Sequence, residues 1–107
     1  MCQGCAVDQE ETVFSATSEG DADHRRVVVT GEVDMATADQ MFQAATRDSA
    51  EHVTLDLRAV TFFDSAAIQA LVRLTDRIPH LSVVPSRRVR RVLDIAGLGD
   101  QGWLSAE

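Results

Sequence analysis

The chain has 107 residues and a formal net charge of −7, with seventeen acidic residues, ten arginines and no lysine. This length predicts one domain, and no apolar run reaches the roughly 20 residues of a membrane-spanning helix. The lack of lysine excludes a P-loop and a pyridoxal Schiff base, and the basic residues form no track for nucleic acid.

The N-terminal residues 1–9 carry no apolar periodicity, so we expect a disordered tail followed by a folded domain over residues 10–107. Cys2 and Cys5 lie in this tail, and the chain has no other cysteine. A metal site needs further ligands, so we predict reduced thiols and no metal. No charged-then-apolar segment opens the chain, which favours a cytoplasmic location.

The first two predicted elements are strands. Weak alternation over residues 11–17 predicts an edge strand, and residues 18–24, with Gly20 and three acids, predict a turn. Residues 25–30 contain three consecutive valines, which are typical of a strand covered on both sides. Residues 31–34 are expected to form the loop that follows.

A helix is predicted next. Thr37 and Gln40 fit a capping box, in which each side chain binds a backbone N–H of the first turn. Residues 47–51 should end this helix. Its core face is expected at helical spacing, at Ala38, Met41, Phe42 and Ala45.

The stretch from 52 to 74 combines a strand and a helix. Its first part alternates between apolar and polar residues, which indicates a half-buried strand with Val53, Leu55 and Leu57 on one face and His52, Thr54 and Asp56 on the other. Phe62 and Phe63 should form a short apolar loop. Asp64 is then predicted to cap a helix that begins at Ser65. The core face of that helix is expected at Ala67, Ala70, Leu71 and Leu74.

The last part of the chain predicts a strand and a helix. Pro79 should end the preceding helix, residues 81–84 form a short buried strand, and Ser86 caps the final helix. Gly97 is a natural C-terminal cap, and Trp103 and Leu104 should pack back on the sheet. The helix has an apolar stripe at Val89, Val92, Leu93 and Ala96. Its first turns carry Arg87, Arg88, Arg90 and Arg91, which form either a solvated face or a contact with an acidic partner or phosphate.

These elements predict an α/β fold of order β-β-α-β-α-β-α, with one mixed sheet of four or five strands. Right-handed crossovers that advance in one direction put the helices mainly on one face. Loops at the carboxyl ends of parallel strands lie side by side, so Asp34, Asp64, Ser65 and Ser86 should share one edge.

Three blocks of the sequence stand out together. They are Gly-Glu-Val-Asp-Met-Ala-Thr-Ala (31–38), Asp-Leu-Arg-Ala-Val-Thr-Phe-Phe-Asp-Ser-Ala-Ala (56–67) and Pro-Ser-Arg-Arg-Val-Arg-Arg-Val-Leu-Asp-Ile-Ala-Gly-Leu (85–98). In this order they resemble the STAS domain of bacterial anti-sigma-factor antagonists. The resemblance implies a non-enzymatic module that binds an anti-sigma-factor serine/threonine kinase. Phosphorylation at Ser65 would release it, and a phosphatase would reset it, without a cofactor.

The resemblance also implies roles for residues around Ser65. Asp34 and Asp64 are predicted neighbours of the phosphate, and the expected partner contacts are Thr37, Ala66, Ala67 and Gln69. Members of the family commonly have glycine where this chain has Ala67. The added methyl group could change which partner approaches closely.

Two other interpretations remain open. The same fold could serve another regulatory complex or bind a small ligand or nucleotide. A serine hydrolase would need His24, His52 or His80 as a base for Ser65, but the Gly-x-Ser-x-Gly pattern is not present. His52 and His80 also precede their strands, at the opposite edge from Ser65. A receiver domain is excluded, because it uses a lysine beside its phosphorylated aspartate.

Overall fold

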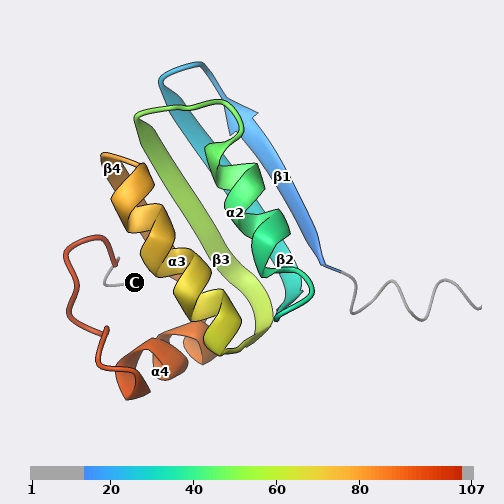
Figure 1. Ribbon diagram of the computed structural model, residues 1–107, viewed down its shortest axis with the longest axis vertical. Helices are drawn as coiled ribbons and strands as arrows, with labels where there is room; N and C mark the ends of the chain where they lie inside the picture. Colours follow the sequence, from blue (N-terminus) through green and yellow to red (C-terminus); the bar gives the residue numbers. More distant parts are fainter. Residues whose placement is uncertain (1–13, 105–107) are drawn as a thin grey trace, which may run out of the picture.

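The computed structural model describes residues 14–104 and shows one four-stranded mixed sheet. The strands β1 (Ser15–Gly20), β2 (His24–Val33), β3 (His52–Phe63) and β4 (His80–Pro85) lie in that order across the sheet. β1 is antiparallel to β2, and β2, β3 and β4 are parallel to one another (Figure 1). The predicted mixed sheet is therefore confirmed, with four strands.

Three helices complete the predicted order β-β-α-β-α-β-α. The helices α2 (Ala38–Thr46) and α3 (Ser65–Arg77) pack against each other on one face of the sheet, as crossovers of one hand require (Figure 1). The helix α4 (Arg87–Ile95) packs against β3 and β4, at the end of the sheet where β3 leads into α3. None of the helices in residues 14–104 is long and apolar enough to cross a membrane.

The core lies between this face of the sheet and the helices. The predicted core faces of α2 and α3 are confirmed, because all eight side chains are buried. α4 adds two buried side chains of its predicted stripe, whereas Val92 is half-buried and Ala96 is exposed. The largest completely buried side chains come from the sheet and from all three helices. They include Met41, Leu55, Leu57, Leu71, Leu74 and Leu93.

The strands differ from the predicted ones at their ends. β1 runs to Gly20 because its pairing with β2 continues up to a tight turn, in which the carboxylate of Asp21 accepts the N–H groups of Asp23 and His24 at 3.1 and 2.9 Å. Residues 11–13 of the predicted first strand lie outside the described residues, as do Cys2, Cys5 and the predicted tail.

The strands β2 and β3 also extend beyond their predicted ends. Their pairing continues through two register shifts to Val33 and Phe63. Residues 31–33 are therefore strand and not loop, and Phe62 and Phe63 end β3 where an apolar loop was predicted. This pairing between distant segments overrides the local turn signals.

Two predicted helix caps are confirmed. The side chain of Asp64 accepts the N–H of Ala67 at 3.0 Å, and the side chain of Ser86 accepts the N–H of Val89 at 3.1 Å. α4 ends at Ile95, and Gly97 follows the C-cap residue Ala96 with a φ of +83°, which suits glycine at the predicted helix end.

The predicted capping box at Thr37 is wrong. Thr37 does precede α2, but its side chain makes no cap hydrogen bond. The hydroxyl instead donates to the carbonyl oxygen of Glu32 at 2.9 Å and accepts the N–H of Asp34 at 2.9 Å. These two hydrogen bonds fix the conformation of the loop that leads into α2.

The C-terminal segment packs on the edge of the sheet, as predicted. The N–H of Val83 donates to the carbonyl oxygen of Trp103 at 2.8 Å, and Leu104 forms an isolated parallel bridge with Val83. Trp103 and Leu104 are half-buried against the core. This contact places a short piece of backbone beside β4.

Asp56 is a buried carboxylate on the sheet face opposite α2 and α3. Only 5% of its surface is exposed, because Arg58 and Arg26 bind its two oxygens at 2.6–3.0 Å. Hydrogen bonds from Arg58, together with that from Arg26, overcome desolvation and hold the pKa of Asp56 well below its usual range.

Three histidines begin the three parallel strands. His24, His52 and His80 are paired in register, and their rings stack with centroid separations of 4.3 and 4.4 Å. Within residues 14–104 no group of histidine, cysteine or acidic side chains is arranged to hold a metal ion. The Nδ1 atom of His52 is buried and has no hydrogen-bond partner among these residues.

We predict that Asp56→Ala lowers the free energy of unfolding by about 1–3 kcal/mol at pH 7, because two guanidinium groups lose their acceptor. The folded pKa of Asp56 lies below the unfolded value, so its contribution is complete above about pH 4 and is lost as pH falls further. Denaturant titrations at pH 7 and pH 3 should show the difference shrinking in acid. The exposed Asp100→Ala is the control, and a difference that grows in acid would contradict this account.

We also predict that His52→Phe keeps or slightly raises the melting temperature at pH 7.5, because phenylalanine retains the ring stack and removes a buried, unpaired nitrogen. His52→Ala should lower it, since aromatic pairs contribute about 0.5–1.5 kcal/mol beyond their buried area. Thermal unfolding followed by circular dichroism measures both. Equal losses in the two variants would show that the ring nitrogen itself is needed.

Candidate functional site

Ser65 is an exposed serine at the first position of α3. Asp64 precedes it in extended conformation, with φ −103° and ψ −170°, and its side chain caps the helix. The first N–H groups of a helix lack intrahelical acceptors, and the helix dipole makes this end positive. The serine hydroxyl therefore lies at a helix end that tolerates an anion.

The loops that follow β2 and β3 lie next to each other. Val33 and Phe63 are paired at the ends of these strands, and the N–H of Asp64 donates to the carbonyl oxygen of Val33 at 3.2 Å. Asp34 follows Val33 directly. The sheet therefore brings the loop of Asp34 beside the loop of Asp64 and Ser65.

Asp34 is held by its own loop. Its carboxylate oxygen Oδ1 accepts the N–H groups of Ala36 and Thr37 at 2.9 and 3.2 Å, and the hydroxyl of Thr37 lies at 3.2 Å. The carboxylate of Asp64 is similarly bound to a backbone N–H. Both negative charges near Ser65 are partly offset by these donors, which also fix the two side chains.

The start of α4 is tied to the same strand. The hydroxyl of Ser86 donates to the carbonyl oxygen of Val60 at 2.9 Å, four residues before Asp64. Figure 1 shows the start of α3 directly above α4, at the lower end of the view. The loops after β2, β3 and β4 thus lie at one end of the sheet.

The residues predicted to contact a partner differ from one another in how exposed they are. Gln69 is exposed, and Thr37 and Ala66 are half-buried. Ala67 is 0% exposed and belongs to the core face of α3, so it does not form part of the exposed surface in this structure, and its contact with a partner stays a prediction. Its methyl group points away from any protein that would bind at Ser65.

Two apolar residues of the site were not predicted as exposed. Met35, next to Asp34, is 82% exposed, and Phe62, three residues before Ser65, is 46% exposed. No clear signal in the sequence marks Phe62, because the alternation of buried and exposed residues along β3 is lost after Leu57, where the pairing with β2 shifts register. Exposed apolar side chains that form a patch rimmed by polar groups are typical of protein-binding surfaces, so these two residues are candidates for a partner contact.

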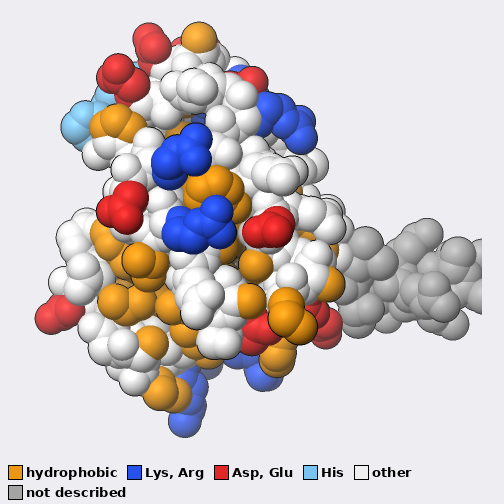
Figure 2. Space-filling view, viewed as in Figure 1, with side chains coloured by type: hydrophobic (Ala, Val, Ile, Leu, Met, Phe, Trp, Pro, Cys, Tyr) orange, Lys and Arg blue, Asp and Glu red, His pale blue; other side chains and the backbone are white. Residues whose placement is uncertain are grey.

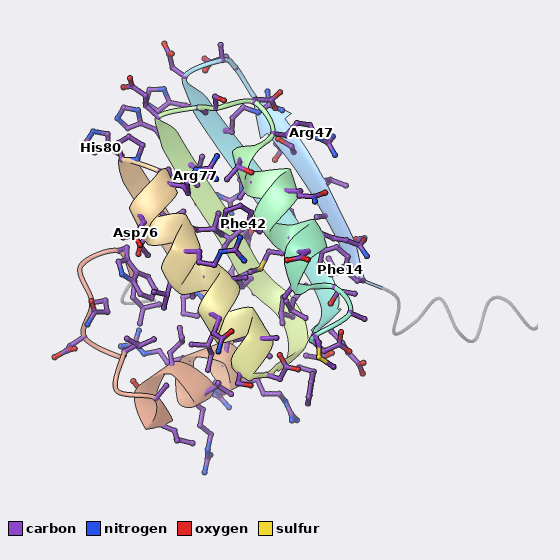
Figure 3. The ribbon with its side chains drawn as sticks, in the orientation of Figure 1. Phe14, Phe42, Arg47, Asp76, Arg77 and His80 are labelled. Carbon is purple, nitrogen blue, oxygen red and sulfur yellow. The ribbon has the colours of Figure 1, made fainter. Side chains whose placement is uncertain are left out.

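The histidines lie far from Ser65. They begin β2, β3 and β4, whereas Ser65 follows the last residue of the 12-residue β3. Such a strand is roughly 40 Å long at about 3.3 Å per residue. In Figure 3, His80 lies at the end of the sheet opposite the start of α3. None of these histidines can act as a base for Ser65.

Comparisons with known proteins agree with this architecture. A family model of the STAS domain matches residues 15–107, and a search of curated proteins gave no match. An anti-sigma factor antagonist from Mycobacterium paratuberculosis has a similar structure, with 26% identity, a TM-score of 0.78 and coverage of 90% of this chain and 88% of that chain.

Two structures of SpoIIAA share the fold. The unphosphorylated anti-sigma factor antagonist SpoIIAA has 18% identity and a TM-score of 0.68, covering 87% of this chain and 86% of that one. The phosphorylated form of this Bacillus cell fate determinant has 17% identity and a TM-score of 0.63, covering 87% and 89%. Since the family model covers almost all the described residues, this chain belongs to the STAS domain family.

Proposed function

We propose that this protein is an anti-sigma-factor antagonist that works by partner switching. Unphosphorylated, it binds an anti-sigma-factor serine kinase; phosphorylation at Ser65 releases it, and a phosphatase resets it. The observation that carries the proposal is an exposed serine at the start of α3 in a STAS domain, directly after the fixed carboxylate of Asp64 and beside the loop of Asp34. The similarity to an anti-sigma factor antagonist at 26% identity supports the choice of partner.

The fold should tolerate a phosphate at Ser65. A phosphate brings roughly −1.5 to −2 charges, and the helix end favours an anion by about 0.3–1 kcal/mol. Asp34 and Asp64 oppose it, but backbone donors already bind both carboxylates. The opposing effects are similar in size, so the folded structure changes little.

A phosphate at Ser65 would affect the binding of a partner much more strongly than it affects the fold. A partner that binds here is expected to cover Ser65 together with the exposed side chains of Met35, next to Asp34, and Phe62, near the end of β3, and so to remove water from Ser65. Burying an unpaired charge costs several kcal/mol, and each 1.4 kcal/mol is tenfold in affinity. One phosphate is thus sufficient to end binding without a conformational change.

We predict that Ser65→Asp folds normally and binds the kinase at least about tenfold more weakly, whereas Ser65→Ala binds like the unphosphorylated protein and is never released. The added aspartate has one charge, so it should mimic the phosphate only in part. Titration calorimetry against the kinase recovered with Ser65→Ala measures this effect.

The control is Ser49→Asp, which adds the same charge at an exposed loop position before β3, at the other end of the sheet. It should bind like wild type. Equal affinities of wild type and Ser65→Asp, with phosphate mapped to another residue, would remove the proposed mechanism.

A second prediction concerns the apolar contacts. Met35→Ala with Phe62→Ala should reduce kinase affinity by about tenfold or more, because each large apolar side chain contributes about 1.5–3 kcal/mol when fully buried. The free protein should keep its melting temperature, since both side chains are already exposed. Val72→Ala, at an apolar residue of α3 that is 40% exposed, is the control. Unchanged affinity of the double variant would place the partner elsewhere.

A further inference from the structure

Four arginines form a concentrated positive surface on α4. Arg87, Arg88, Arg90 and Arg91 are four of the ten arginines in the chain, and they lie within five consecutive residues. Together with Asp94 they line an open hollow of about 570 Å³. Figure 2 shows basic side chains projecting at the lower end of the molecule, where α4 lies. We call these four residues the α4 arginine surface.

This arrangement is unfavourable for the isolated domain. Cations at the first turn of a helix oppose the helix dipole, and like charges three or four residues apart repel by a few tenths of a kcal/mol. Arg87, Arg88 and Arg91 are exposed, and no carboxylate of residues 14–104 lies within ion-pair distance of them. For these three arginines no ion pair within residues 14–104 offsets the repulsion, whereas Arg90 donates to the carbonyl oxygen of Gly99.

The α4 arginine surface lies at the same end of the sheet as Ser65. The residue before Arg87 is Ser86, whose hydroxyl is bound to Val60 of β3 at 2.9 Å. α4 packs against β3, the strand that leads directly into Ser65. A protein that covers Ser65 can therefore extend over the first turns of α4.

We propose that the α4 arginine surface is a second docking contact, which binds a cluster of carboxylates on the anti-sigma factor. This inference rests on the proposed function and adds to it the chemistry of the partner. Guanidinium groups bind carboxylates in paired hydrogen bonds, and a concave arrangement of several can hold more than one acidic side chain.

The overall charge favours an acidic protein patch over other polyanions. The chain has a net charge of −7, so nucleic acid or an anionic membrane would repel most of its surface. Attraction between two small patches acts within the Debye length of about 8–10 Å and is less affected by the remaining charge. The expected contribution is faster association, because complementary patches steer the encounter.

The test reverses the charge at three arginines. Arg87→Glu/Arg88→Glu/Arg91→Glu should fold normally, since acids are favoured at the start of a helix. The control Arg47→Glu/Arg73→Glu/Arg77→Glu changes the net charge equally at exposed positions at the end of α2 and along α3. Circular dichroism verifies that both variants fold.

Association with the kinase is measured by stopped flow at 0.05 M and 0.5 M salt. The α4 variant should associate about tenfold more slowly than the control at low salt, and this difference should largely disappear at high salt, as for other steered complexes. Equal rates in the two triple variants would overturn the inference. The proposed function would survive that result if Ser65→Asp still loses the kinase.

A second measurement does not depend on the kinase. Fluorescein-labelled deca-glutamate, a 20-base-pair DNA duplex and phosphatidylserine vesicles are compared as probes at low salt. Binding of deca-glutamate to wild type that is lost in the α4 variant but kept in the control supports the carboxylate-binding surface, even if no kinase complex forms. No binding of deca-glutamate, or tighter arginine-dependent binding of the duplex or vesicles, would overturn it.

Discussion

The parallel pairing of β2 with β3 is the constraint on which the site depends. It continues to the last residue of each strand, where Val33 and Phe63 are paired and Asp64 donates its N–H to Val33. This register fixes where two loops begin. Asp34 must then lie in a loop next to the one with Asp64 and Ser65, although thirty residues separate these carboxylates in sequence.

The same constraint supports the proposal that a charge at Ser65 can act without a change in the fold. The carboxylate of Asp34 is bound within its own loop, and that of Asp64 is bound to the first turn of α3. Neither must move when Ser65 gains a charge. Under the proposed function, a charge at Ser65 therefore acts on what can bind to the surface, and the buried residues Ala67 and Leu71 beneath it need not move.

The sequence predicted the element order, the core faces of α2 and α3, and the caps at Asp64 and Ser86, because these depend on local periodicity and local hydrogen bonds. It failed where distant segments decide the outcome. The ends of β2 and β3 follow from their mutual pairing, and the hydroxyl of Thr37 is taken by Glu32. Ala67 was predicted both as core and as partner contact, and its burial confirms the core prediction that helical spacing made. The roles of the residues at Ser65 remain predictions.

The contact between Val83 and Trp103 has a consequence for how the protein behaves at high concentration. β4 is the last strand of the sheet, and an outer strand exposes backbone groups that can pair with another molecule. Here one of these groups is already bonded to the chain's own C-terminal segment, and Leu104 lies alongside. The C-terminal segment therefore leaves less of the β4 edge free to pair with another molecule.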